Sequence, residues 1–429
     1  MEISEIYERY LVSTGVCTDT RAVLQGRMFF ALKGANFNGN KYATAALDKG
    51  CSFAVVDEEL DGDEDARIIK VNDVLTALQQ LASYHRQHFQ GKVIALTGSN
   101  GKTTSKELMA AVLSSRYSLT YTKGNLNNHI GVPLTLLDAK VVDDFVIVEM
   151  GANHQGEIAM LCEIAQPDYG IVINIGKAHL EGFGGIEGVK KGKTEMYKYL
   201  QSMGGTIFFN LEEPSLDEFK SSLEAPLFYG GESEVHTVRS VIVKGRLQVD
   251  MKFGSDSELI CSQLFGAYNS NNILTAAAVG YYFEIDPQLI KHAIETYVPA
   301  NNRSQLLTTS KGNSLVLDAY NANPTSMKNA IQEFQIMAGN KGVLILGDMR
   351  ELGADSLALH QGILNEIQAQ DRLILVGEVF SNCQIGEGTQ SFKSVEPLCE
   401  FLQLNPISNT QVLIKGSRGI SLEKVVPFL

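Results

Sequence analysis

The chain has 429 residues, and at about 150 residues per domain this length predicts about three domains, each able to bury its own core. Hydrophobic residues make up 44% of the chain and charged residues 20%, as in ordinary globular proteins, which excludes wholesale disorder. The formal net charge of -13 disfavours attraction to nucleic acid or to an anionic membrane surface, so we expect neither as a partner. An anionic ligand would therefore need a local cradle or a metal ion.

The cysteines and the apolar segments predict a cytoplasmic protein. The six cysteines are scattered without a CxxC pair or metal-ligand spacing, so we expect reduced thiols rather than disulfides or a metal site. Residues 1–12 carry acidic side chains where a signal peptide would be basic, and they lack a continuous apolar core. The uncharged stretch 266–283 contains asparagines and a serine, which make it too polar for a membrane-spanning helix.

The first ninety residues predict a small α/β domain. Short strand-like runs at 28–32 and 52–56 are separated by turns rich in glycine and asparagine, and a helix-like stretch follows at 74–89. We place the end of this first domain, residues 1–90, where a new pattern begins.

From residue 92 the pattern alternates strands with helices. Apolar strands are expected at 92–97, 144–150 and 169–175, and helices are expected from 102 to about 115 and from about 156. Such alternation predicts a parallel, doubly wound sheet, which we assign to a central domain of residues 91–300.

The same alternation recurs after residue 313. It predicts a second, smaller parallel sheet in a third domain, residues 301–429, and so an α/β fold class with three domains. The expected strands are 314–320, 342–348, 372–377 and 411–416, and the expected helices are 326–337 and 356–369.

The sharpest local motif is the glycine-containing segment 98–104, which directly follows a strand and opens a helix. Glycines let backbone N–H groups turn toward a phosphate, Lys102 can neutralise its charge, and the Thr103 hydroxyl can ligate Mg²⁺. The spacing departs from the strict GxxxxGK[ST] pattern, because Leu96 stands five residues before Gly101. An ordinary glycine-rich turn is the alternative. The residues expected at the nucleotide are Gly98, Ser99, Asn100, Gly101, Lys102, Thr103 and Thr104.

Three polar side chains further along the central domain are candidate site residues. Glu149 lies near the end of one expected strand, His179 follows the next strand, and Lys193 comes later in the chain. A carboxylate and an imidazole at neighbouring strand ends suit metal ligation. Each residue taken singly could instead be structural or exposed. Because a phosphate loop also fits any nucleotide hydrolase, switch or kinase, these residues alone do not choose an activity.

Four segments carry more specific motifs. They are 97–104 (TGSNGKTT), 149–158 (EMGANHQGEI), 174–185 (NIGKAHLEGFGG) and 318–327 (DAYNANPTSM). In these segments the chain resembles the Mur ligase family of peptidoglycan synthesis, and the motifs extend from Asp19 to Arg418. The resemblance implies an N-terminal domain that holds the UDP-sugar end, a central P-loop-type ATPase domain, and a mobile, Rossmann-like C-terminal domain that binds an incoming dipeptide. It also implies a monomer.

The resemblance implies ATP and two Mg²⁺ ions as cofactors. By similarity, Lys102 contacts the ATP phosphates, Thr103 and Glu149 help to hold one Mg²⁺, and His179 ligates the second. Lys193 matches a lysine that family members carry as a carbamate. Carbamylation has chemical sense, because it converts a cation that would repel Mg²⁺ into a carboxylate-like ligand.

Further family residues match positions near the nucleotide. Asn269 and Asn272 resemble asparagines near adenine, with helix capping as the alternative for Asn269. Arg303 matches an arginine that reaches the phosphates from the domain junction, and Asp318 matches the acid at the ribose. The chain departs from the family at Tyr268, where the family usually has histidine, and at residues 301–302, where two asparagines stand in place of the usual glycine.

The substrates implied by the resemblance are UDP-N-acetylmuramoyl-tripeptide and D-alanyl-D-alanine. Short amides suit neutral recognition of sugar and peptide groups, and cations at strand ends could hold a carboxylate. Solvated loops and a basic surface cluster are the alternatives. The residues expected at the substrates are Asp19, Thr20 and Arg21 at the uridine end, Asn125, Asn127 and Asn128 at the muramoyl peptide, and Asn321, Asn323, Lys415, Ser417 and Arg418 at the dipeptide.

The activity implied by the resemblance is ATP-dependent amide formation through an acyl phosphate, catalysed by a ligase that forms a C–N bond. Another amino-acid-adding ligase of the same fold, similar to folylpolyglutamate synthase, is one alternative. A nucleotide-gated switch is the other, although a switch has no need of a second-substrate site. The sequence predicts neither the third residue of the peptide nor a general base.

Overall fold

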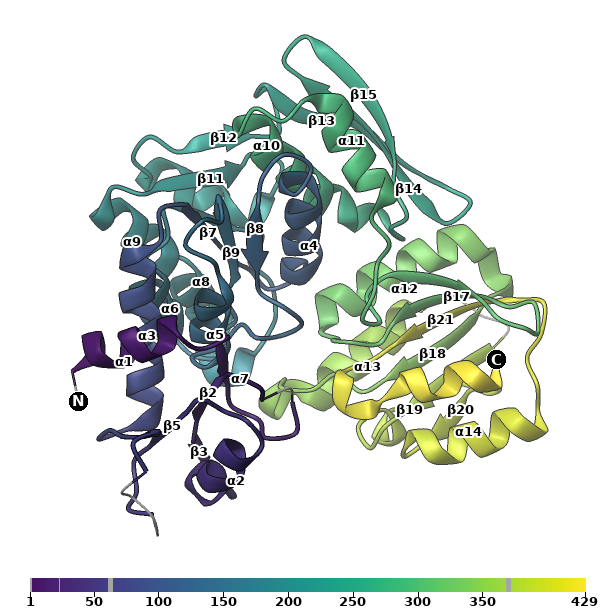
Figure 1. Ribbon diagram of the computed structural model, residues 1–429. Coiled ribbons are helices and arrows are strands. Elements are labelled where there is room, and N and C mark those ends of the chain that lie inside the picture. The colour runs from purple at the N-terminus through teal and green to yellow at the C-terminus, as the bar shows by residue number, and fades with distance from the viewer. Residues whose placement is uncertain (1, 23, 61–64, 368–371) are drawn as a thin grey trace.

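A computed structural model describes residues 2–22, 24–60, 65–367 and 372–429 (Figure 1). Three mainly parallel sheets follow one another along the chain, and helices pack on their faces. In Figure 1 the C-terminal part, drawn green to yellow, lies to one side of the central sheet. The α/β fold class with three sheet-centred regions is confirmed.

The N-terminal sheet has the strand order β1-β2-β5-β6, and all its pairings are parallel. Its most buried strand, β2, is fully apolar, so it needs cover on both faces. Helix α3 starts where the Asp73 side chain accepts a hydrogen bond from the Thr76 N–H. The elements are α1 (Ile3–Leu11), β1 (Val16–Cys17), β2 (Met28–Phe30), β3 (Lys33–Gly34), β4 (Phe37–Asn38), α2 (Ala43–Asp48), β5 (Phe53–Val56), β6 (Ile68–Lys70) and α3 (Val74–His88).

The central sheet has the order β12-β11-β10-β7-β9-β8, and all its pairings are parallel. Strands β7, β9 and β10 are neighbours, so their carboxyl ends meet at one edge of the sheet. The elements are β7 (Lys92–Thr97), α4 (Lys102–Leu113), β8 (Leu119–Tyr121), α5 (Gly131–Asp138), β9 (Phe145–Glu149), α6 (Glu157–Ala165), β10 (Tyr169–Val172), α7 (Leu180–Phe183), α8 (Ile186–Lys193), α9 (Glu195–Met203), β11 (Thr206–Asn210) and β12 (Leu227–Tyr229).

A three-stranded antiparallel sheet, β13-β14-β15, was not expected from the sequence. Strand β14 alternates buried and half-buried or exposed residues, which is the period of a half-covered strand. Two helices pack against this sheet and the central one. The elements are β13 (Val235–Val243), β14 (Arg246–Phe253), β15 (Asp256–Cys261), α10 (Ser270–Tyr282) and α11 (Pro287–Thr296).

The C-terminal sheet has the order β16-β17-β21-β18-β19-β20. The expectation of a smaller, wholly parallel sheet is wrong, because the described residues form six strands, as in the central sheet, and β16 pairs antiparallel to β17. The expected helix end at residue 369 lies outside the described residues. The elements are β16 (Gln305–Thr308), β17 (Ser314–Asp318), α12 (Pro324–Ala338), β18 (Val343–Gly347), α13 (Ser356–Glu366), β19 (Arg372–Val376), β20 (Gln390–Phe392), α14 (Val395–Leu404) and β21 (Gln411–Lys415).

The buried apolar side chains connect the three regions unequally. One cluster joins Ile6 and Leu81 of the N-terminal region to Val93 and Leu161 of the central region. The C-terminal sheet has its own clusters on its two faces, and among their buried members Phe265 alone precedes residue 300. The first two regions therefore share a core, while the third is nearly separate.

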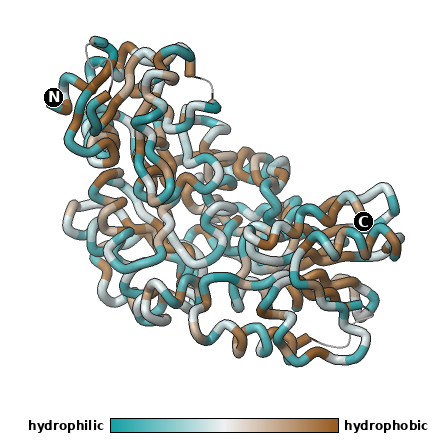
Figure 2. The backbone as a smooth tube through the Cα atoms, turned by 90° about the horizontal axis from the view of Figure 1, so that it is seen from below, coloured by the Kyte–Doolittle hydropathy of each residue, from teal (hydrophilic) through white to brown (hydrophobic). Residues whose placement is uncertain are grey.

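Hydrophobic and hydrophilic segments alternate along the tube in every part of the molecule (Figure 2). Among the helices of the described residues, none is both long and apolar enough to cross a membrane.

Candidate active site

A cavity of about 750 Å³ opens between the carboxyl edge of the central sheet and the C-terminal region. Eighteen of the predicted site residues line it: Ser99, Asn100, Gly101, Lys102, Thr103, Thr104, Asn125, Asn127, Asn128, Glu149, His179, Asn269, Asn272, Arg303, Asp318, Asn321, Lys415 and Arg418. Seven predicted residues are absent from its lining: Asp19, Thr20, Arg21, Gly98, Lys193, Asn323 and Ser417.

The loop between β7 and α4 has the shape of a phosphate cradle. Gly101 is left-handed at φ 78°, and a Cβ at this position would lie 2.3 Å from the Asn272 Oδ1 atom. The backbone N–H of Asn100 donates to Asn174 Oδ1 at 2.9 Å, and Asn174 Nδ2 donates to the Asn100 carbonyl at 3.1 Å. These contacts hold the loop so that the first amides of α4 open toward the cavity.

The Lys102 ammonium group folds back onto this loop. Its Nζ donates to the Gly98 carbonyl at 2.6 Å. Burial lowers the pKa of Lys102, and the charge of Arg303 lowers it further, while Glu149 opposes the shift. Two cations therefore converge on the space in front of the loop, which favours an anionic ligand there.

The Glu149 carboxylate is buried at the end of β9 and is only half satisfied. Oε1 accepts hydrogen bonds from Asn127 Nδ2 at 2.8 Å and from Thr103 Oγ1 at 3.2 Å. Oε2 has no hydrogen-bond partner among the described residues, and Lys106 Nζ lies 3.8 Å away from it. A buried, orphaned carboxylate oxygen next to a threonine hydroxyl fits the donor set of Mg²⁺.

His179 is paired across the cavity. It is left-handed at φ 52°, immediately before α7, and its Nδ1 lies against the Glu351 carboxylate of the loop after β18, a contact that is an ion pair when the imidazole is protonated. The hydrogen bond from His179 lowers the pKa of Glu351. The sequence reasoning missed Glu351, although the strand end at Gly347 was a signal that ligand-facing residues follow.

Lys193 ends helix α8, is 1% exposed and does not line the cavity. Its Nζ lies 5.4 Å from the centre of the Phe183 ring. Burial holds the pKa of Lys193 well below its usual range, and repulsion from Lys102 adds to this shift. This environment favours an uncharged amine. Among the described residues, no three or more His, Cys, Asp or Glu side chains are grouped so that they could hold a metal ion.

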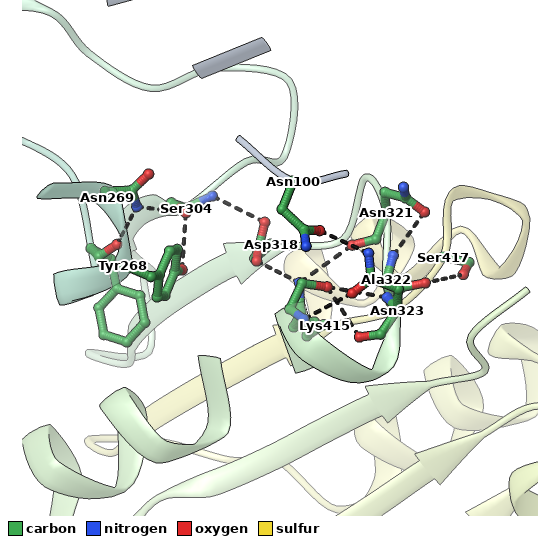
Figure 3. Close-up of polar contacts among 12 residues, drawn as sticks. Asn100, Tyr268, Asn269, Ser304, Asp318, Asn321, Ala322, Asn323, Lys415 and Ser417 are labelled. Atoms are coloured by element: carbon green, nitrogen blue, oxygen red, sulfur yellow. Dashed lines mark hydrogen bonds and ion pairs between the residues drawn. The ribbon is translucent and has the colours of Figure 1, made fainter. Parts of the chain in front are cut away.

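The two predicted adenine-site asparagines form a buried network next to the loop. Asn272 Oδ1 accepts from Ser105 Oγ at 3.0 Å, and Asn272 Nδ2 donates to Asn269 Oδ1 at 2.7 Å. Asn269 Nδ2 donates to the Phe265 carbonyl at 2.7 Å. Figure 3 shows Asn269 beside Tyr268, whose hydroxyl lies 3.1 Å from Ser304 Oγ.

Arg303 follows two residues with left-handed backbone. Asn301 and Asn302 have φ values of 58° and 57°, a conformation that favours glycine and that asparagine tolerates. The Arg303 guanidinium carbon lies 3.8 Å from the centre of the Tyr320 ring, and its buried Nε has no hydrogen-bond partner among the described residues. The guanidinium group is therefore stacked and still able to bind an anion.

The residues at the C-terminal strand ends are already partly paired. Lys415 Nζ donates to Asp318 Oδ2 at 2.6 Å, and Asp318 Oδ1 accepts from the Ser304 N–H at 3.3 Å (Figure 3). Ser417 Oγ accepts from the Arg350 N–H at 3.0 Å. Arg418 is more accessible, because it pairs with Glu423 only at 3.5 Å and its side chain is 61% exposed.

The predicted uridine-side residues lie outside the cavity. Arg21 and Asp19 form an exposed ion pair at 2.7 Å. Asp348, directly after β18, accepts hydrogen bonds from the N–H groups of Val379 and Phe380 at 2.8 and 2.9 Å. Asp348 therefore holds the loop after β19.

Two further residues were not predicted from the sequence: Tyr320, which lines the cavity, and Lys106, which does not. Tyr320 lies under Arg303, and the Arg418 guanidinium carbon is 5.7 Å from the centre of the same ring. Lys106 follows Lys102 by one turn of α4, and its Nζ donates to the Thr122 carbonyl at 2.5 Å and pairs with Glu107 at 3.1 Å. The one-turn spacing from Lys102 was the available signal.

Comparison with known proteins decides the family. Residues 13–86 match the catalytic domain of the Mur ligase family, residues 96–280 match the Mur ligase middle domain, and residues 302–418 match the Mur ligase glutamate ligase domain. The chain is 33% identical over 433 residues to the UDP-N-acetylmuramoyl-tripeptide--D-alanyl-D-alanine ligase of Bacillus subtilis (strain 168), covering 98% of this chain and 93% of that protein. The chain belongs to the Mur ligase family. The resemblance in the four sequence motifs is thereby confirmed.

Solved structures agree with this assignment. A crystal structure of MurF from Acinetobacter baumannii superposes with a TM-score of 0.84 at 28% identity, covering 98% of this chain and 97% of that chain. A MurF ligase from Thermotoga maritima in complex with ADP also has a TM-score of 0.84, over 98% of this chain and 97% of that one; at 24% identity it supports the fold alone. The three-sheet arrangement is thus that of a Mur ligase.

Proposed function

We propose that this Mur ligase joins D-alanyl-D-alanine to UDP-N-acetylmuramoyl-tripeptide in an ATP-dependent reaction of peptidoglycan synthesis. The observation that carries the proposal is that one cavity contains the phosphate loop, the half-satisfied Glu149 and the C-terminal strand ends. Identity to a ligase of this name extends over 98% of the chain, so the substrate-binding regions are included as well as the nucleotide site.

The reaction requires activation of a carboxylate, which is a poor electrophile. Transfer of the γ-phosphoryl group to a carboxylate oxygen of the tripeptide forms an acyl phosphate and releases ADP. The amine of D-alanyl-D-alanine then attacks the carbonyl carbon, the C–N bond forms, the amine loses its proton, and phosphate leaves. Charge neutralisation and positioning supply most of the catalysis.

The phosphate loop binds ATP in this proposal. The amides at the start of α4 hold the phosphates, and Lys102 exchanges its bond to the Gly98 carbonyl for a phosphate oxygen. Arg303 reaches the same anion from the domain junction with its unpartnered Nε. Thr103 and Glu149 are suited to hold Mg²⁺, and bound Mg²⁺ would neutralise charge that develops on the phosphates.

Lys193 is carbamylated in this proposal, and its carbamate would add an oxygen ligand for a second Mg²⁺ near His179. The uncharged amine reacts with CO₂: its nitrogen lone pair forms the N–C bond, one proton leaves, and a carbamate anion remains. The buried, pKa-lowered amine favours this reaction, and Lys102 nearby would stabilise the product charge. His179 would have to exchange its contact with Glu351 for the metal.

The domain roles follow the chain order. We assign residues 1–90 to the UDP-sugar end, residues 91–300 to ATP, and residues 301–429 to the dipeptide. Asn125, Asn127 and Asn128 line the cavity on the muramoyl-peptide side, and the exposed Arg418 is suited to the dipeptide carboxylate. Because ATP is available in the cytoplasm, we place the reaction there.

A product assay tests the activity. The purified chain is incubated with ATP, Mg²⁺, UDP-N-acetylmuramoyl-tripeptide containing either lysine or meso-diaminopimelate, and D-alanyl-D-alanine or a single amino acid. The expected product has the mass of the tripeptide substrate plus D-alanyl-D-alanine minus water. Ligation of single amino acids only would favour the alternative ligase, and ADP release without a second substrate would favour a nucleotide switch.

The carbamate has a direct spectroscopic test. Incubation with ¹³C-bicarbonate should give a carbamate carbon resonance in the wild-type protein that is missing from the Lys193→Ala variant. A spectrum without this resonance at saturating bicarbonate would contradict the carbamate.

A further inference from the structure

Asn323 contacts the phosphate loop instead of the cavity. Its Nδ2 donates to Asn100 Oδ1 at 2.7 Å, although 223 positions separate the two residues in the chain (Figure 3). The same side chain is the N-cap of α12, because its Oδ1 accepts from the Ser326 N–H at 2.9 Å. Asn323 is 4% exposed, so both ends of its amide are used inside the protein.

The direction of the Asn100 side chain depends on the conformation of the phosphate loop. The Asn100 backbone N–H and carbonyl are both held by the Asn174 side chain, so the direction of the Asn100 side chain depends on the folded loop. The side-chain amides of Asn174, Asn100 and Asn323 therefore connect the end of β10, the phosphate loop and the start of α12 through successive hydrogen bonds. A loop with another backbone path would point the acceptor oxygen of Asn100 away from Asn323.

The helix start is also close to the chain after β10. A Cβ built on Gly176 would lie 3.6 Å from Asn100 Nδ2 and 3.7 Å from Thr325 Oγ1, which is ordinary van der Waals contact. A larger side chain at this position would crowd both surfaces. The two regions therefore meet at the mouth of the phosphate loop through polar groups and a glycine.

We propose that the Asn100–Asn323 hydrogen bond docks the C-terminal region onto a correctly folded phosphate loop. Asn323 is then a positioning residue for the transfer step and not a substrate ligand. Docking brings the accessible Arg418 and the cavity-lining Asn321 over the nucleotide site only when the loop is in its binding shape. The kinetic part of this proposal rests on the proposed function, whereas the docking part does not.

The test combines two substitutions with scattering and kinetics. Asn323→Ser keeps a good N-cap but is too short to reach Asn100, and Asn100→Ala removes the acceptor while leaving the backbone contacts to Asn174. Each variant should show a larger radius of gyration in small-angle X-ray scattering with ADP and Mg²⁺ bound. The value of kcat/KM for D-alanyl-D-alanine should fall about 3- to 10-fold, as expected for one hydrogen bond.

The double variant decides between docking and independent defects. If the two side chains act through one bond, the double variant should lose no more than the more damaged single variant. Losses that multiply, or an unchanged radius of gyration in both single variants, would overturn the proposal. The ADP dissociation constant of Asn323→Ser should stay within about twofold of wild type, because Asn323 does not line the cavity.

A surface ion pair on the same helix supplies the matched control. Lys328 of α12 pairs with Glu366 of α13 at 2.9 Å, and both residues belong to the C-terminal region. Lys328→Ala should therefore leave the radius of gyration unchanged. If wild type makes no ligation product, the proposed function fails, while the scattering measurements still decide the docking contact.

Discussion

The two junctions between the regions of this molecule differ in chemical character: one is apolar and the other is polar. The N-terminal and central regions meet through apolar side chains of one core cluster, such as Ile6, Leu81 and Leu161. The contacts between the central and C-terminal regions at the cavity are polar, and they include Asn100 with Asn323 and His179 with Glu351.

The apolar and polar character of the two junctions indicates which part of the ligase can move. Burying apolar surface contributes about 25 cal/mol per Å², so a shared core holds two regions together permanently. One hydrogen bond contributes about 1 kcal/mol, and an exposed ion pair contributes about 0–1 kcal/mol. Polar contacts of this size can open to admit substrates and close to exclude water from an acyl phosphate.

The largest expected effect is a loss of catalysis that leaves both junctions between the regions unchanged. Lys102→Ala should lower kcat/KM by a factor of about 10³, because the phosphates lose a preorganised cation. The melting temperature and the radius of gyration should change little, since neither junction uses this side chain. Steady-state ADP release, thermal unfolding and scattering measure the three quantities, with the exposed Lys92→Ala as control. Unchanged turnover would remove Lys102 from the nucleotide site.

The apolar junction should respond in stability. Leu81 is fully buried in the shared cluster, so Leu81→Ala should lower the free energy of unfolding by about 2–5 kcal/mol. The N-terminal and central regions should still unfold in one urea transition. Leu404→Ala is the control, because Leu404 is 82% exposed and its loss should cost under about 0.5 kcal/mol. Separate transitions for the two regions would contradict the shared core.

Lys193 lies on the central side of the polar junction and tests the chemistry there. Lys193→Ala should lower activity by about 10- to 100-fold, in the range seen when metal-site support is lost. Acetate should restore part of the activity, because a small carboxylate can occupy the position of the carbamate. Thermal stability should fall modestly, because the loss of the buried methylene groups leaves a cavity. A variant that retains full activity without acetate would exclude a role for Lys193.

The smallest expected effect is on docking, and it comes from Glu351, the exposed partner of His179 at the polar junction. Glu351→Gln removes the charge that pairs with His179, and the Glu351 side chain is 59% exposed. The docked state should weaken by under about 1 kcal/mol. Scattering at low salt should detect a larger radius of gyration, and the difference from wild type should shrink at high salt. A difference that grows with salt would argue against an ion pair.

Much of the fold could be predicted because the central strands are continuous apolar runs between turn signals. Strands β7 and β19 start at the residues expected for them, and α12 starts at Pro324, two residues before the expected position. The earlier start has a physical reason: Asn323 caps the helix and proline fits its first turn. The sheet β13-β14-β15 was missed although β14 alternates with the period of a strand.

The sequence could predict single residues of the site but not the contacts between them. Strand ends and the phosphate loop indicated which side chains face the cavity, because parallel strands bring their carboxyl ends together. Pairings between segments far apart in the chain, such as Lys415 with Asp318 or His179 with Glu351, depend on how those segments pack, and no local pattern encodes them.

The Asn174 side chain determines at which step the conformational entropy of the phosphate loop is lost. This single side chain binds both the N–H and the carbonyl of Asn100, so the protein itself holds the loop in this conformation without a nucleotide. The conformational entropy is therefore lost when the chain folds and not when the nucleotide binds. A loop without the Asn174 contacts would bind the same phosphates more weakly. It would also no longer offer the C-terminal region a surface of fixed shape on which to dock.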